Sequence, residues 1–198
     1  MRFLFADTDA AGLVNPGPNL LFVAVVGAAG QVREVPEVCN VQAFGAIPGD
    51  DGEDTAAIQA AIDAVPDGGT IRFPAGVYYS HGLRFTGRAG LALAGDGPDV
   101  SILKRPVTAP ADARIATMED CVDMVVTQLG FDVNGISRYG GFMCASCRRI
   151  TFTLNHFFDS HKLPLGAEDR YAMVFGFGER PHEDILIAQN RVEDLQVE

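Results

Sequence analysis

Hydrophobic and polar residues follow one another along most of this chain in short runs, separated by turns rich in glycine, proline and aspartate. Short runs of this kind are typical of β-strands, whereas helices need longer periodic segments. Strands are expected at residues 70–73, 77–79, 82–85, 91–94, 101–104 and 115–118. The pattern therefore predicts a protein built mainly of short strands and tight turns.

One segment has helical periodicity instead. Ile58, Ile62 and Val65 recur at helical spacing with small alanines between them, so one face of residues 54–65 is apolar and can pack on another element. Asp54 is a suitable N-cap residue, and the turn at 66–69 ends the helix. An extended segment at 41–46 is expected to lead into it.

The second half of the chain contains an imperfect repeat. Three segments align, and they begin at Cys121 (CVDMVVTQLGFDV), Cys147 (CRRITFTLNHFFD) and His182 (HEDILIAQNRVED). A constant strand core with loops of varying length is typical of solenoids, in which each repeat forms one coil. The alignment predicts interior columns Met124/Ile150/Ile185, Val126/Phe152/Ile187 and Phe131/Phe157/Val192, and an amide ladder of Asn155 and Asn190.

Two domains are predicted: a β leader or appendage at residues 1–38, and the coil stack at 39–198. Within the leader, residues 20–26 and 31–38 can form a β-hairpin around a glycine-containing turn. The final repeat ends without a capping pattern, which would leave an open strand edge. We therefore expect a second copy of the chain or a further β-helix segment to cover it.

Charge and composition narrow the classes of partner. The 198 residues include 26 acidic and 15 basic side chains, a formal net charge of -11, which argues against binding to nucleic acid. No run approaches the roughly 20 apolar residues of a membrane span. The apolar stretch at 20–29 follows a segment without net positive charge, so it is interpreted as a buried strand rather than a signal peptide. The four cysteines are too few to indicate a disulfide scaffold.

A family resemblance rests on residues 41–79. The succession FGA, an acidic glycine-containing loop, DTAAIQAAIDA, GGT and FPAGVY resembles the N-terminal signature of the pectate-lyase-like right-handed parallel β-helix superfamily. That group includes pectate- and rhamnogalacturonan-active enzymes, alginate epimerases and phage tailspikes. The resemblance implies that the helix caps the end of the coil stack, that the partner is a polysaccharide, and that the protein is extracellular or virion-associated.

A second, local resemblance concerns chemistry. The run FGFGERPHE at residues 175–183 resembles the YGFDPHE run of bacterial mannuronan C5-epimerases with an insertion, and LGFDVNG at 129–135 resembles their LTLDGN coil. The likeness implies that Glu179 takes the place of the family's catalytic-site aspartate and His182 that of its histidine. The family's catalytic tyrosine falls on Phe175, which cannot transfer a proton. Tyr171 or Tyr139 would have to replace it.

The loops between repeats carry the candidate site, because equivalent loops of a solenoid emerge on one side. Acid–base chemistry on a sugar needs proton-transferring groups, and a uronate carboxylate needs cations beside it. The candidate catalytic residues are His182, Glu179, Tyr171 and Tyr139, and the candidate substrate-binding residues are Asp132, Arg138, His161, Lys162 and Arg170. This set predicts a lyase or epimerase acting on an acidic polysaccharide.

Two other functions remain open. A non-catalytic glycan-binding or structural tailspike or adhesin module would explain Phe175. A glycoside hydrolase would need two carboxyl groups roughly 5–10 Å apart, for which Asp132, Asp159, Asp169 and Glu179 are candidates. Cys121, Cys147 and His182 share a repeat column, which we interpret as stacked buried side chains rather than metal ligands. No metal and no cofactor are predicted, calcium being left open, and His156 is interpreted as a lone side chain.

Overall fold

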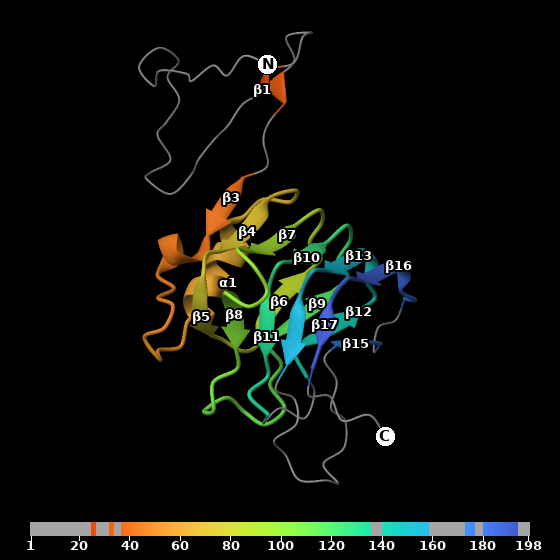
Figure 1. Ribbon diagram of the computed structural model, residues 1–198. Coiled ribbons are helices and arrows are strands. Elements are labelled where there is room, and N and C mark those ends of the chain that lie inside the picture. The colour runs from red at the N-terminus through yellow and green to blue at the C-terminus, as the bar shows by residue number, and fades with distance from the viewer. Residues whose placement is uncertain are drawn as a thin grey trace, which may run out of the picture.

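The computed structural model describes residues 25–26, 32–33, 37–135, 140–158, 173–176 and 180–193. Within these residues the chain forms three parallel sheets around one interior (Figure 1). The six-stranded sheet contains β3 (Val38–Asn40), β4 (Thr70–Phe73), β7 (Ala92–Gly95), β10 (Val125–Thr127), β13 (Arg148–Thr153) and β16 (Glu183–Ala188). The five-stranded sheet contains β5 (Gly76–Tyr79), β8 (Ser101–Lys104), β11 (Gly130–Asp132), β14 (His156–Phe158) and β17 (Arg191–Val192). The four-stranded sheet contains β6 (Leu83–Thr86), β9 (Ala116–Glu119), β12 (Phe142–Ala145) and β15 (Met173–Phe175).

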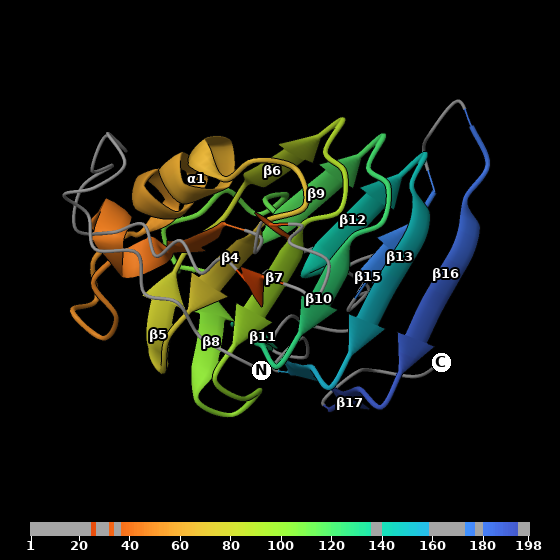
Figure 2. The same ribbon diagram turned by 90° about the horizontal axis from the view of Figure 1, so that it is seen from above.

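The chain visits the three sheets in a fixed order, and each circuit adds one strand to each sheet. Strands β4, β5 and β6 make one coil, β7, β8 and β9 the next, and the order continues to the end of the described chain. Figure 2 shows the strands of the six-stranded sheet lying side by side along the stack. The predicted solenoid of parallel coils is confirmed.

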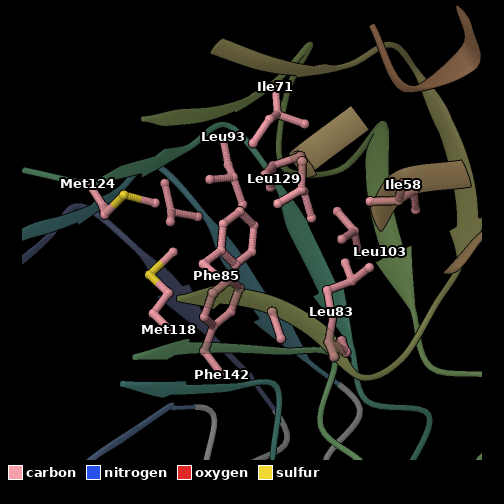
Figure 3. Close-up of a cluster of buried hydrophobic side chains, with 14 of the residues drawn as sticks. Ile58, Ile71, Leu83, Phe85, Leu93, Leu103, Met118, Met124, Leu129 and Phe142 are labelled. Atoms are coloured by element: carbon pink, nitrogen blue, oxygen red, sulfur yellow. The ribbon is translucent and has the colours of Figure 1, made fainter. Parts of the chain in front are cut away.

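The predicted interior columns are also confirmed. In the parallel register Ile150 pairs with Ile185, and Thr151 pairs with Val125, which places Met124 beside Ile150. Met124 and Ile150 are fully buried, and Ile185 packs against the same core. Two further columns match the alignment in register: Val126/Phe152/Ile187 and Phe131/Phe157/Val192. Their members on the last described coil, Ile187 and Val192, are exposed rather than interior. Figure 3 shows how leucine, phenylalanine and methionine side chains from successive coils meet in this interior.

Asparagine side chains hold the corner between the six-stranded and five-stranded sheets. The Asn155 side chain accepts from the Leu129 N–H at 3.1 Å and donates to the Val126 carbonyl at 2.8 Å. Its amide also donates to Asn190 Oδ1 at 3.0 Å. Asn155 is 1% exposed, so water cannot reach its amide. These bonds satisfy the hydrogen-bonding groups of the buried amide instead. The predicted amide ladder is present.

A helix closes one end of the stack. Helix α1 (Thr55–Ala64) buries Ile58, Ala61 and Ile62 against the first coils, and Figure 2 shows it at that end of the row of strands. Arg88 joins the C-terminal end of the helix to the following coil. Its guanidinium donates to the carbonyls of Ile62, at 2.7 Å, and Val65. The prediction that this helix caps one end of the coil stack is therefore confirmed.

One local expectation near this helix was wrong, and a second is confirmed in position but not in its hydrogen bonds. Residues 41–46 are not extended, because Val41–Phe44 form a 3₁₀ helix (η1) that ends at Gly45 with φ of 101°. Asp54 occupies the N-cap position, but its carboxylate makes no capping bond. It accepts instead from the Ile47 N–H at 2.7 Å and the Tyr79 N–H at 3.1 Å, so it ties the preceding loop to the first coil.

Strands β1 (Val25–Val26) and β2 (Val32–Arg33) pair antiparallel, as in the hairpin expected for the leader. The proposed domain boundary near residue 38 stays a prediction. Among the described residues, no helix has the length and apolar character required to cross a membrane.

Candidate functional site

Asp132 is the described candidate residue with the most constrained environment. It ends β11 on the outer side of the five-stranded sheet and is only 5% exposed. Its Oδ2 lies 2.7 Å from Nζ of Lys104, its register partner on β8, and its Oδ1 accepts from the Asn134 N–H at 2.7 Å. A buried carboxylate needs such partners, because an unpaired charge there would be strongly destabilising.

Two connections leave the five-stranded sheet beside this ion pair. One follows Asp132 and reaches β12 at Phe142, and the next follows Phe158 and reaches β15 at Met173. Asp132 and Phe158 are register partners, and so are Phe142 and Met173. Both connections therefore begin side by side and end side by side, as expected for equivalent loops of consecutive coils.

Most of the predicted site residues belong to these connections or to the turn after β15. Their placement lies outside the described residues: Tyr139, Arg138, His161, Lys162, Arg170, Tyr171 and Glu179. Their proposed roles stay predictions. The structure establishes only the strand ends next to these segments, where Asp132 pairs with Phe158.

His182 lies where the chain passes from the four-stranded sheet to the six-stranded sheet, just before β16. Its Nδ1 accepts from the Cys147 N–H at 3.3 Å, and its ring meets the Phe175 ring edge-on, with the centroids 5.8 Å apart. The Nε2 atom is buried and has no hydrogen-bond partner within the described structure. Because Nδ1 accepts this bond, the neutral ring carries its proton on Nε2, which is a buried donor without an acceptor among the described residues.

Asp132 and His182 occupy different parts of a coil. The chain enters the four-stranded sheet shortly after Asp132 and leaves it shortly before His182. The contacts of Asp132 are to Lys104 and Asn134, whereas those of His182 are to Cys147 and Phe175. The two side chains therefore have different neighbours and do not form one site by direct contact.

The interpretation of His156 as a lone side chain was wrong. Its Nδ1 lies 2.9 Å from Asp99 Oδ1 and 2.6 Å from Arg191 Nη2, and its Nε2 lies 3.4 Å from Glu193 Oε2. The ring also packs on Phe158 with a centroid separation of 4.4 Å. Asp99 belongs to a turn two coils away, so no local sequence signal could have indicated this cluster.

Phe175, the position aligned with the tyrosine of the epimerase motif, packs against other rings. Its ring packs edge-on against Phe152, with centroids 6.1 Å apart, as well as against His182. The position is therefore part of the apolar interior. No group of three or more histidine, cysteine, aspartate or glutamate side chains suited to a metal ion occurs among the described residues.

Comparison with known proteins agrees with this architecture. Residues 38–131 match the profile of the family described as rhamnogalacturonase A/epimerase, pectate lyase-like. Over these residues the chain is similar to that family, and its fold is a parallel β-helix. No curated protein matches the chain in sequence.

Solved structures show the same β-helix at low sequence identity. A 1,3-α-1,4-β-D-galactose-4-sulfate-3,6-anhydro-D-galactose-2-sulfate 4 galactohydrolase is 16% identical with a TM-score of 0.56, over 77% of this chain and 37% of its own. The iota-carrageenase of family GH82 from A. fortis is 14% identical with a TM-score of 0.52, over 80% of this chain and 42% of its own. A glycosyl hydrolase candidate from Parabacteroides merdae is 14% identical with a TM-score of 0.50, over 79% of this chain and 98% of its own.

At these identities the likeness concerns the fold. The β-helix described here spans less than half the length of the first two structures. The activities named for them are properties of those proteins.

Proposed function

We propose that this β-helix acts on an acidic polysaccharide by lyase or epimerase chemistry, in an extracellular or virion-associated setting. The observation that carries the proposal is the buried Asp132–Lys104 pair at the strand ends where two connections begin next to each other. Those connections contain the predicted cations Arg138, Lys162 and Arg170. The named activities of the similar structures, which include carbohydrate hydrolases, support polysaccharide as the substrate class.

The proposed reaction begins with removal of the proton next to the uronate carboxylate. That proton becomes acidic only when cations offset the charge of the carboxylate, and the proposal gives this role to Arg138, Lys162 or Arg170. His182, Tyr171 or Tyr139 would move the proton, with Glu179 beside them. The unpartnered Nε2 of His182 supports its inclusion.

A non-catalytic glycan-binding module is the alternative that a specific observation favours. Phe175 stands where the epimerases carry a tyrosine, and its ring is packed against Phe152. The position cannot transfer a proton. Under this alternative the same surface would bind polysaccharide without changing it.

The test uses a panel of polyuronates incubated with the full chain. Ultraviolet absorbance of an unsaturated product reports lyase action, solvent deuterium incorporated at C5 reports epimerase action, and calorimetry reports binding. The proposal expects product or deuterium from at least one polymer, lost in His182→Ala and retained in His81→Ala. His81 is the matched control because it lies on an earlier coil, paired with Glu53 at 3.2 Å. Binding without turnover would establish the module instead, and neither binding nor turnover would overturn both functions.

A further inference from the structure

Three buried cysteines lie together where the four-stranded sheet turns into the six-stranded sheet. Cys121, Cys144 and Cys147 are 0%, 1% and 0% exposed, and all are unpaired thiols. Cys147 follows Cys144 by three residues and lies at the position next to Cys121 on the following coil. Cys147 is therefore the central sulfur of the cluster.

Cys121 and Cys147 occupy equivalent positions on consecutive coils. Val122 and Arg148, the residues that follow them, form a parallel bridge, and the Arg148 N–H donates to the Cys121 carbonyl at 3.0 Å. Neighbouring parallel strands lie about 4.8 Å apart. This spacing falls inside the roughly 4.4–6.8 Å range of Cα separations that a disulfide spans.

Cys144 is placed differently, although it precedes Cys147 by only three residues. It lies inside β12, where its register partner is Met118 on the preceding coil. Its neighbours along that column are thus Met118 and Phe175, neither of which can cross-link. The backbone register therefore favours Cys121 over Cys144 as the partner of Cys147.

At rest two of the three cysteines, Cys121 and Cys144, are held in the unreactive thiol form. The Cys121 thiol donates to the Phe85 carbonyl at 3.3 Å, and the Cys147 thiol donates to the Ala145 carbonyl at 3.3 Å. Hydrogen bonding to Cys147, together with burial, raises the pKa of Cys121 and Cys144 above the ordinary thiol value. The same contacts lower the pKa of Cys147, which makes it the more reactive sulfur, since the thiolate is the reactive form. Cross-linking in the closed stack would still be slow, because burial keeps an oxidant away from all three sulfurs.

We propose that Cys121 and Cys147 are a covalent cross-linking site, which a small disulfide oxidant joins into a disulfide between two consecutive coils. With oxidised glutathione, one protein thiolate attacks the glutathione disulfide and releases one glutathione thiolate. The second protein thiolate then attacks the protein sulfur of the mixed disulfide and releases the other. Two cysteine thiols are oxidised, one glutathione disulfide is reduced to two thiols, and the two protons pass to the released glutathione.

The test measures which disulfide forms at equilibrium. The result then does not depend on how slowly an oxidant reaches the buried sulfurs. The full chain is unfolded and refolded in a mixture of oxidised and reduced glutathione, then unfolded again with an alkylating reagent and mapped by peptide mass spectrometry. The expected result is one cross-linked peptide pair joining Cys121 to Cys147, with Cys39 and Cys144 alkylated. The oxidised protein should melt several degrees higher than the reduced protein, and a reductant should reverse the shift.

Cys39→Ala and Cys121→Ala are the matched variants. Cys39 lies on β3 and is buried, so its replacement should leave the cross-link and the reversible melting shift intact. Cys121→Ala should lose both. A map in which Cys147 pairs with Cys144, or in which all four thiols remain alkylated, would overturn the proposal. The wild-type map decides the matter even if Cys121→Ala does not refold.

Discussion

Nδ1 of His156 lies 2.9 Å from Oδ1 of Asp99, although 57 residues separate them in sequence. Asp99 belongs to the turn before β8 and His156 to β14, so the contact passes across β11. The intervening position in this column is Gly130, which pairs with Ile102 on one side and His156 on the other. A residue without a side chain leaves room for this contact.

Acidification should weaken the Asp99 contact. The hydrogen bond to His156, with help from Arg191, lowers the pKa of Asp99. A lowered pKa in the folded state stabilises the fold above the unfolded value of an aspartate, about 3.9, and that contribution is lost as the pH falls through the folded pKa. Denaturant unfolding should show wild type to be more stable than Asp99→Asn near neutral pH, with the difference closing in acid. A difference that persists unchanged in acid would contradict this assignment.

Gly130→Ala should destabilise the stack. An added Cβ would lie 2.4 Å from the Pro98 carbonyl oxygen and 3.0 Å from Ile102 Cγ1. Backbone must move to accept it, so we expect a loss of about 1–3 kcal/mol in unfolding free energy. Gly176→Ala is the control, because an added Cβ there meets nothing within 4 Å. Equal losses for the two variants in urea unfolding would refute the steric explanation.

Asn155→Ala should cost more than Asn190→Ala. Removing the Asn155 amide leaves the Leu129 N–H and the Val126 carbonyl without their partner in a buried corner. Unsatisfied buried groups of this kind cost about 1–3 kcal/mol each. Asn190 is only half-buried, so water can replace part of what its removal takes away. Thermal unfolding of both variants checks which one loses more stability. A larger loss for Asn190→Ala would show that burial does not determine how much each asparagine contributes.

Arg88→Met should loosen the helical cap. It removes the bonds to Ile62 and Val65 at the end of α1 and the Arg88–Asp67 pair at 2.9 Å. Because the carbonyls are near the helix terminus and partly buried, we expect a loss of about 1–3 kcal/mol. Arg149→Met is the matched control, since it removes an arginine whose pair with Asp123 is half exposed. Denaturant unfolding of the two variants should show the larger loss for Arg88, and hydrogen exchange should locate it in α1.

The fold could be predicted because the same few residue types recur at equivalent positions. Aligning Met124, Ile150 and Ile185 gave the register that the structure confirms, since a one-residue slip would turn each column outward. Local conformation was harder to predict. The Asp54 carboxylate serves Ile47 and Tyr79 rather than the helix, and only the loop geometry decides between these partners.

The candidate site could be predicted only in outline. Asp132 was identified as a loop residue, but its burial and its pairing with Lys104 depend on the stacking of β8 and β11. The His156 cluster could not be predicted, because Asp99 meets it across an intervening coil. Sequence repeats indicate which residues share a column, whereas contacts that skip a coil require the side-chain geometry.

The contact across Gly130 also constrains how this protein can change during evolution. In a stack whose coils touch only their immediate neighbours, a whole repeat can be duplicated or deleted with little effect on the others. The Asp99–His156 contact spans one intervening coil. An extra repeat inserted between the two residues would place them too far apart to form a hydrogen bond. Duplications and losses of repeats should therefore accumulate outside the interval between β8 and β14.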